Sequence, residues 1–389
     1  MNSDEPPSTV NQPAPRVVHL DDGRLWRGGQ HQVWLLLGEL ARRGIAQMLV
    51  AHDGCPLTLR AREAGIEVET VHFRGEWDWR TPRRIAALAD AFGANLLHAH
   101  TSHAHTLGLR ALRQMRQRGM LVTTRRVDFA IRRNILSRRK YKLPGQHFIA
   151  ISRAVRDVLV AGGVAPERID VVHSGVPPIA AEKLEPRAAV RAELGLASDE
   201  IAIVNIGALT DHKGQRWLIE AGPEVFRAFP RARIHILGEG ELRPALEQRI
   251  RELNLRGRVI LHGHVENARL KLAAFDLFVS SSHLEGLGTV NLDAMLAGVP
   301  VVAAAAGGVP EIVEDGRTGR LVPARDAGAL ARAIVEALSN PAETAAMIER
   351  GRRHVEEHFS AASMAAGTLA VYRKLLAAHA AAGFVALGR

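Results

Sequence analysis

The first candidate site in the sequence combines two acids with a glycine-rich loop. Glu285 is followed by the loop glycines Gly286 and Gly288. A helix is predicted to begin at Thr289, and Asp293 lies about one turn inside it. Free backbone N–H groups at a helix start suit a phosphate, and two acids beside it suit the hydroxyl groups of a sugar or a ribose. The same spacing is equally typical of a loop acid and of an acid that stabilises the helix dipole.

A second candidate site follows the strand predicted over Ile201–Ile206. Gly207 ends that strand, and Lys213 stands just before a helix predicted over Gln215–Phe229. A cation at this place can reach a diphosphate and neutralise a leaving group, although a surface lysine is the simpler interpretation. Gly238, after the next strand, either shapes the floor of the same pocket or forms a tight turn.

The third candidate site contains His98 and His100, which follow a strand predicted to end near Leu97. Two histidines are potential metal ligands, but no third ligand is evident nearby in the sequence and no Asp-x-Asp motif is present. The alternative is a pair of ordinary loop histidines. We therefore expect no metal.

Basic residues are concentrated in one segment, Arg125–Lys142. It holds eight Lys or Arg and one acid, Asp128, and contributes +7 to a chain whose net charge is +10. Its arginines are Arg125, Arg126, Arg132, Arg133, Arg138 and Arg139. Apolar residues such as Phe129 and Ile135 lie between them, which suits an anionic membrane surface or a phosphorylated lipid. Nucleic-acid binding and a plain solvated face are the alternatives.

Strands and helices alternate along both halves of the 389-residue chain, with a proline-containing break between them. Alternation of this kind predicts the α/β class, with two Rossmann-like, doubly wound parallel-sheet domains that face a cleft. The expected organisation is a disordered tail (1–15), an N-terminal domain (16–173), a linker with a lead-in helix (174–200), a C-terminal domain (201–360) and a final helix that returns to the N-terminal domain (361–389).

The composition favours a cytoplasmic protein. Cys55 is the single cysteine, so the chain cannot form an internal disulfide framework, as is usual in a reducing compartment. The first residues lack the apolar core of a signal peptide, and no stretch has the roughly 18 apolar residues of a membrane-spanning helix. The basic segment leaves room for a peripheral position at the inner face of the cytoplasmic membrane.

The motifs resemble those of the retaining glycosyltransferases of family 4 (glycosyl transferases group 1), which have the two-domain B-type fold. That family has a Glu, seven residues and a second Glu, where this chain has Glu285 and Asp293, so the second acid departs from the pattern. The segments 307–313 and 315–322 match the family well. The resemblance spans Val17 to Tyr372 and is most specific in the C-terminal half.

The resemblance implies a role for each candidate residue. The catalytic candidates are His100 at the reaction centre, Glu285 on the donor sugar and Lys213 on the diphosphate. The implied donor-binding residues are Gly28, Gly29, Gly207, His212, Gly238, Val265, Gly286, Leu287, Gly288, Thr289 and Asp293, the last on the ribose. The family's usual arginine on the diphosphate is Ala208 here, so that contact is missing or comes from His212 or Arg216.

The implied activity is retaining, metal-independent, hexosyltransferase-type transfer from a nucleotide-diphospho sugar, UDP- or GDP-linked, to a glycan or lipid-linked acceptor. Synthesis of bacterial cell-envelope polysaccharide or lipopolysaccharide is the expected setting, with no further cofactor and no nucleic acid. The alternatives are a same-fold sugar-nucleotide epimerase or hydrolase, and a degenerate transferase that serves as a basic surface-binding protein.

Overall fold

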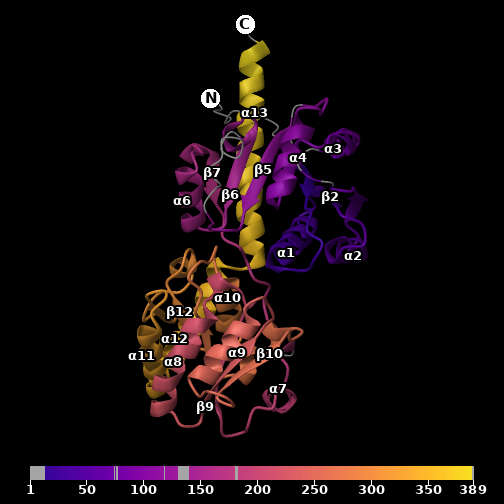
Figure 1. The fold of residues 1–389 in the computed structure, drawn as a ribbon. Coiled ribbons are helices and arrows are strands. Elements are labelled where there is room, and N and C mark those ends of the chain that lie inside the picture. Colours follow the sequence, from indigo (N-terminus) through magenta and orange to yellow (C-terminus); the bar gives the residue numbers. More distant parts are fainter. Residues whose placement is uncertain are drawn as a thin grey trace, which may run out of the picture.

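The computed structural model describes residues 14–73, 75, 78–117, 119–129, 140–179 and 183–387. Two parallel sheets form the centres of two lobes, which lie one above the other in Figure 1. The first lobe contains the sheet of strands β1 to β7, and the second contains the sheet of strands β8 to β13. The predicted fold class is thereby confirmed.

The first sheet has seven parallel strands in the order β3-β2-β1-β4-β5-β6-β7. Its strands are β1 (Arg16–Leu20), β2 (Ala46–Ala51), β3 (Glu67–Thr70), β4 (Leu96–Ala99), β5 (Met120–Arg125), β6 (Gln146–Ala150) and β7 (Ile169–Val171). Its helices are α1 (Gly28–Arg42), α2 (Pro56–Glu63), α3 (Arg80–Phe92), α4 (Ser102–Leu112), α6 (Arg153–Ala161) and the short η1 (Pro166–Arg168). The strand order reverses between β1 and β4, and ligands bind at such a switch point in open parallel sheets.

The second sheet has six parallel strands in the order β10-β9-β8-β11-β12-β13. Its strands are β8 (Ile201–Ile206), β9 (Ala232–Leu237), β10 (Val259–Gly263), β11 (Leu277–Ser280), β12 (Val301–Ala304) and β13 (Arg320–Val322). The helices around it are α7 (Arg187–Glu193), η3 (Asp211–Lys213), α8 (Gln215–Ala228), α9 (Arg243–Glu252), η4 (Ala268–Ala274), α10 (Thr289–Leu296), η5 (Val309–Glu311), α11 (Ala327–Ser339) and α12 (Pro341–His358). Its switch point lies between β8 and β11.

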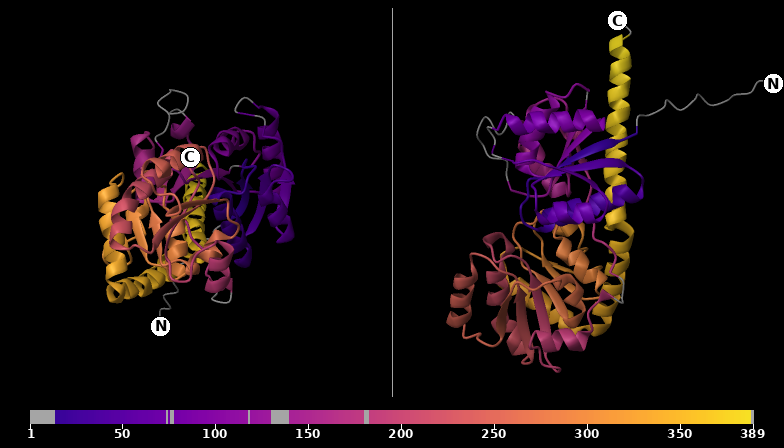
Figure 2. Two further views of the ribbon diagram at one scale, coloured as in Figure 1. Left: turned by 60° about the horizontal axis from the view of Figure 1, so that its bottom comes forward. Right: turned by 90° about the vertical axis from the view of Figure 1, so that its right-hand side faces the viewer.

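The last helix, α13 (Ala361–Leu387), packs against the first lobe although it follows the second lobe in sequence. Both views in Figure 2 show it alongside the first sheet. Tyr372 is fully buried there, in an apolar cluster with Val17 of β1 and Leu40 of α1. Among the helices that the structure describes, none combines the length and apolarity needed to cross a membrane.

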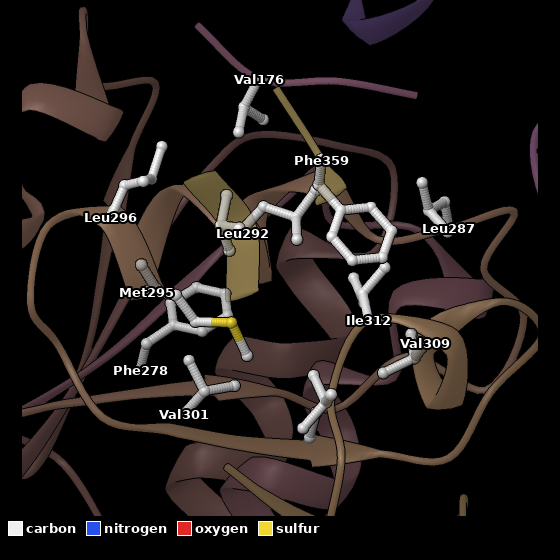
Figure 3. Packing of buried hydrophobic residues seen from close by; sticks show 14 of the residues in the cluster. Val176, Phe278, Leu287, Leu292, Met295, Leu296, Val301, Val309, Ile312 and Phe359 are labelled. Carbon is white, nitrogen blue, oxygen red and sulfur yellow. The ribbon is translucent and has the colours of Figure 1, made fainter. Parts of the chain in front are cut away.

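The helix α10 is fixed by an apolar core, which Figure 3 shows from close by. Leu292 and Met295 of α10 pack with Phe278 of β11 and with Phe359, which precedes α13. The same cluster includes Ile151 from the first lobe. Burial of a large apolar side chain contributes about 1.5–3 kcal/mol, so this cluster holds the start of α10 at the junction of the two lobes.

One local prediction needs correction. The helix after His100 begins at Ser102, because Thr101 caps it by accepting a hydrogen bond from the Ala104 N–H. The strand before it continues to Ala99, so His98 belongs to a buried strand and not to a loop. The helix α6 begins after Ser152, whose hydroxyl accepts a hydrogen bond from the Val155 N–H.

Candidate active site

Lys213 and Glu285 meet where the β8 and β11 loops converge. The Lys213 Nζ lies 2.5 Å from the Glu285 Oε2, and the Ser282 hydroxyl donates to the same oxygen at 3.2 Å. Both charged side chains are largely but not fully buried, with 24% and 16% exposed. The structure therefore brings together two residues that are 72 positions apart in sequence and that were predicted to act on one ligand.

Glycines shape the start of α10. Gly288 has a φ of +83°, and a Cβ there would lie 2.8 Å from the Asn291 amide nitrogen. A Cβ on Gly286 would lie 2.3 Å from the Arg126 backbone oxygen of the other lobe. Neither position tolerates a side chain, and with glycine at both positions the backbone of this loop can approach a ligand closely. Leu287, between them, is buried and serves packing.

The strand ends of the second sheet also depend on glycine. Gly238 has a φ of +154°, and a Cβ on it would lie 1.9 Å from the Gly207 oxygen. Its N–H donates to the Gly263 oxygen at 2.7 Å. These contacts place Gly207 and Gly238 side by side at the edge of the site. Val265, just beyond, packs on the same core as α10.

Asp293 lies inside α10 and pairs with Arg269 from η4. The Arg269 Nε donates to the Asp293 Oδ1 at 2.8 Å, and its Nη2 donates to the Pro177 oxygen at 2.7 Å. Burial raises the pKa of Asp293 to about 6, although Arg269 opposes the shift. The acid that departs from the family pattern thus has a cationic partner, which sequence reasoning did not find.

Three histidines form a buried cluster in the first lobe. His19 of β1 stacks on His100 with ring centroids 5.3 Å apart, and the His19 Nδ1 lies 3.0 Å from the His100 Nε2. Behind them, the His98 Nδ1 lies 2.5 Å from the Tyr372 hydroxyl of α13, and its Nε2 lies 2.7 Å from a threonine hydroxyl of β5. Burial lowers the pKa of all three rings, that of His19 to about 3. They are neutral at physiological pH.

The cluster has nitrogens within 4.8 Å of one another, the spacing that a metal ion needs. Its chemistry opposes a cation, because both ring nitrogens of His98 already have hydroxyl partners. The Arg126 guanidinium also lies 3.4 Å from the His100 Nδ1. A fixed positive charge at that distance repels a metal ion.

The network assigns the tautomer of His100. A guanidinium only donates, so the His100 Nδ1 accepts from Arg126 and the His100 Nε2–H donates to His19. The His19 Nε2 then carries a hydrogen that has no partner among the described residues. His100 is held in one orientation by a cation on one side and an imidazole on the other.

Contacts between the lobes surround this region, and sequence reasoning missed them. The Asp128 Oδ2 accepts from the Glu285 N–H at 2.8 Å. Glu311 of the second lobe accepts from the Arg153 N–H at 2.9 Å and the Ala154 N–H at 3.2 Å, and so caps α6 of the first lobe. His173 also contacts Glu311 at 2.9 Å. Only Glu311 carried a sequence signal, since it lies in a segment that matches the family.

The other predicted residues occupy varied places. Gly28 and Gly29 are the first residues of α1, where an added Cβ would meet nothing within 4 Å. His212 packs edge-on against Phe129 of the first lobe, with ring centroids 5.8 Å apart. Arg125 donates to the Tyr141 hydroxyl at 3.2 Å. Thr289 is the first residue of α10. Arg132, Arg133, Arg138 and Arg139 lie outside the described residues.

Family comparison agrees with this fold. Residues 186–354 match the family described as Glycosyl transferases group 1, and residues 26–178 match Glycosyltransferase Family 4. The two matches cover complementary lobes. The chain belongs to the group 1 glycosyltransferases and has their B-type fold.

Individual relatives share part of the chain. A GDP-mannose-dependent monoacylated alpha-(1-6)-phosphatidylinositol monomannoside mannosyltransferase of Corynebacterium glutamicum is 33% identical over 183 residues, which are 45% of this chain and 48% of the relative. The lipopolysaccharide core biosynthesis glycosyltransferase LpsE of Rhizobium meliloti is 34% identical over 170 residues, 44% of this chain and 49% of the relative. The chain thus spans about half the length of these relatives.

A solved structure shares the whole architecture. Anabaena Alr3699/HepE in complex with UDP superposes with a TM-score of 0.78 at 21% identity, and the match covers 92% of this chain and 100% of HepE. At that level of identity the likeness establishes the fold.

Proposed function

We propose that the chain is a retaining glycosyltransferase that moves a sugar from a nucleotide-diphospho sugar to a glycan or lipid-linked acceptor. The observation that carries the proposal is the Lys213–Glu285 pair beside the glycine-bounded start of α10. A lysine and free N–H groups suit a diphosphate, and an acid next to them suits the hydroxyls of the attached sugar.

The reaction needs no protein nucleophile under this proposal. The acceptor oxygen attacks the anomeric carbon from the face that the diphosphate leaves, so the configuration is retained. As the bond from the anomeric carbon to the diphosphate oxygen breaks, the acceptor hydroxyl proton passes to that departing oxygen. Lys213 and the α10 N–H groups stabilise the charge that develops on the leaving group. His100, neutral and fixed in orientation, lies at the reaction centre.

The donor and the setting are proposed from the relatives. HepE was solved with UDP, and the mannosyltransferase relative is GDP-mannose-dependent, which supports a UDP- or GDP-linked donor. The lipid-directed and lipopolysaccharide relatives support an acceptor of the bacterial cell envelope, met at the inner face of the cytoplasmic membrane. The guanidinium beside the histidine cluster supports a mechanism without a metal.

Thermal unfolding tests the proposal. The melting temperatures of the wild type and of Lys213→Ala are measured with UDP, GDP, ADP or CMP. A nucleotide present at a concentration 100 times its dissociation constant stabilises the folded protein by about 2.7 kcal/mol. For a chain of this size the expected rise is several degrees, at roughly 2–4 °C per kcal/mol. One nucleoside diphosphate should raise the melting temperature of the wild type, and the rise should be lost in the variant.

Two other results would favour a different function. Absence of a shift with every nucleotide would favour a degenerate site and a surface-binding protein. A nucleotide shift together with rapid, complete conversion of a nucleotide sugar without any acceptor would favour an epimerase or hydrolase.

A further inference from the structure

Arg126 is a partly buried cation, with its Nε shielded from solvent, and it stands between the two halves of the site. Its backbone oxygen lies against Gly286 of the second lobe. Its guanidinium contacts His100, at 3.4 Å from the Nδ1 and 3.4 Å from the backbone oxygen. The residue was expected on an acceptor- or membrane-binding surface, but its side chain lies at the proposed reaction centre.

The guanidinium lacks the partner that a buried cation ordinarily has. No carboxylate within the described part of the chain lies at ion-pair distance from it, and its Nε has no hydrogen-bond partner there. Asp21 acts on the guanidinium electrostatically, but the Asp21 oxygens accept from the Gly23 N–H and from Gln30. Burial of an unpaired charge is costly, so such a group is usually completed by a ligand of opposite charge.

The charge persists at working pH. Burial lowers the pKa of Arg126 to about 10, which leaves the guanidinium protonated at neutral pH. Arginine is also the side chain best suited to grip a phosphate with two donors.

The site lacks a cation where the resemblance leads one to expect it. Ala208 stands in place of an arginine and is exposed. Arg216 does not replace it, because its Nε pairs with Glu220 at 2.9 Å on an exposed face of α8. His212 does not supply a charge either, since burial, with Lys213 as a further cause, lowers its pKa.

We propose that Arg126 binds the diphosphate of the donor from the first lobe and replaces the arginine that Ala208 lacks. This inference rests on the proposed function. Lys213 then holds the diphosphate from the second lobe and Arg126 holds it from the first, so the leaving group is neutralised only when the lobes are together. An anionic group on the acceptor is the other source of the same chemistry, and the test separates the two.

Calorimetric titration of UDP and GDP into the wild type, Arg126→Gln and Arg126→Lys tests the proposal. In Arg126→Gln, loss of a charge-assisted contact should raise the dissociation constant of the nucleoside diphosphate by about ten- to hundredfold. Arg126→Lys keeps the charge, so it should raise that dissociation constant by less. Arg231→Gln is the matched control, because Arg231 is exposed before the start of β9 and pairs with Asp199, and the nucleotide dissociation constant of this variant should equal that of the wild type. Circular dichroism and melting temperature verify that each variant is folded.

The double variant Arg126→Gln with Ala208→Arg is the decisive arm. If Arg126 fills the role of the missing arginine, restoring that arginine should recover at least a large part of the lost affinity. A merely structural Arg126 would not be rescued by a side chain in the other lobe.

Each contrary outcome is distinct. Unchanged nucleotide affinity in Arg126→Gln, with binding lost in Lys213→Ala, overturns this inference and leaves the proposed function intact. Unchanged nucleotide affinity with a raised KM for the acceptor assigns Arg126 to an anionic acceptor and overturns the diphosphate assignment. If the wild type binds neither nucleotide, the proposed function and this inference fail together.

Discussion

At the scale of single residues, the two candidate acids of the site are each paired with a cation before a ligand arrives. Glu285 is held by Lys213 and Ser282 through one carboxylate oxygen, which leaves the other oxygen available. Asp293 is held in the same way by Arg269. A donor that enters the site must share or replace these partners, so both acids are expected to influence sugar and ribose binding more than folding.

Glu285→Gln tests the proposed contact of Glu285 with the donor sugar. The amide keeps the shape but loses the charge, and a hydrogen bond to a charged group contributes about 1.5–3 kcal/mol. Transfer should fall by roughly ten- to a hundredfold or more, while the dissociation constant of the nucleoside diphosphate changes little. Steady-state kinetics and titration measure the two effects. Glu252→Gln, an exposed acid on α9, is the control and should behave as the wild type.

Asp293→Asn tests the raised pKa of Asp293 through the pH dependence of protein stability. The pKa of Asp293 is raised to about 6 in the folded state, so the folded protein binds the proton more tightly than the unfolded chain. The resulting stability is present at low pH and is lost as the pH rises through about 6. Relative to Asp293→Asn, the wild type should lose about 2 kcal/mol of unfolding free energy between pH 4.5 and 7 in urea titrations. Parallel pH profiles of the two proteins would show that the carboxyl has an ordinary pKa.

At the scale of elements, the site residues lie at strand ends and helix starts, and α13 packs against the histidine cluster. The Tyr372 hydroxyl is the partner of the buried His98 Nδ1, and His98 packs against His100 with ring centroids 4.1 Å apart. The last helix of the chain therefore holds the histidine cluster of the first lobe in place.

Tyr372→Phe removes that hydroxyl and leaves a buried ring nitrogen without its partner. The expected cost is about 1–3 kcal/mol, which should lower the melting temperature by several degrees. Catalytic efficiency should also fall if the position of His100 depends on His98. A variant with wild-type stability and activity would show that α13 packs on the cluster without organising it.

The sequence predicts most elements correctly because buried parallel strands are short apolar runs, and because Ser152 and Gly288 mark helix starts by their own chemistry. It places the Glu285 loop and Lys213 by the same local reasoning. It does not predict that Arg269 reaches Asp293 or that Asp128 reaches the Glu285 N–H. Those contacts join surfaces that are set by tertiary packing, and the second spans 157 residues.

At the scale of the whole molecule, the lobes meet through a few polar contacts around the site. Glu311 caps α6 across the interface and also contacts His173. An acid at a helix start is favoured by the free N–H groups and the helix dipole, and the His173 and backbone contacts outweigh burial and lower the pKa of Glu311. The contact exists only when the lobes are together, so it favours the closed arrangement.

Glu311→Ala should therefore shift the molecule toward an open arrangement. Loss of a helix cap costs about 1 kcal/mol, which corresponds to a several-fold smaller closed population. Small-angle X-ray scattering should show a larger radius of gyration without nucleotide and a return toward the wild-type value when nucleotide is added. Identical scattering of variant and wild type would mean that other contacts fix the lobes.

The central claim is that the residues around Lys213 and Glu285 act on a nucleotide-diphospho sugar. The most direct measurement is phosphorus NMR of UDP-glucose and GDP-mannose incubated with the wild type and with Glu285→Gln. One donor should slowly release its nucleoside diphosphate in the wild type, because water occasionally replaces the acceptor, and the variant should release it far more slowly. Equal release by both proteins, or none with a wild type that also fails to bind nucleotide, would contradict the account.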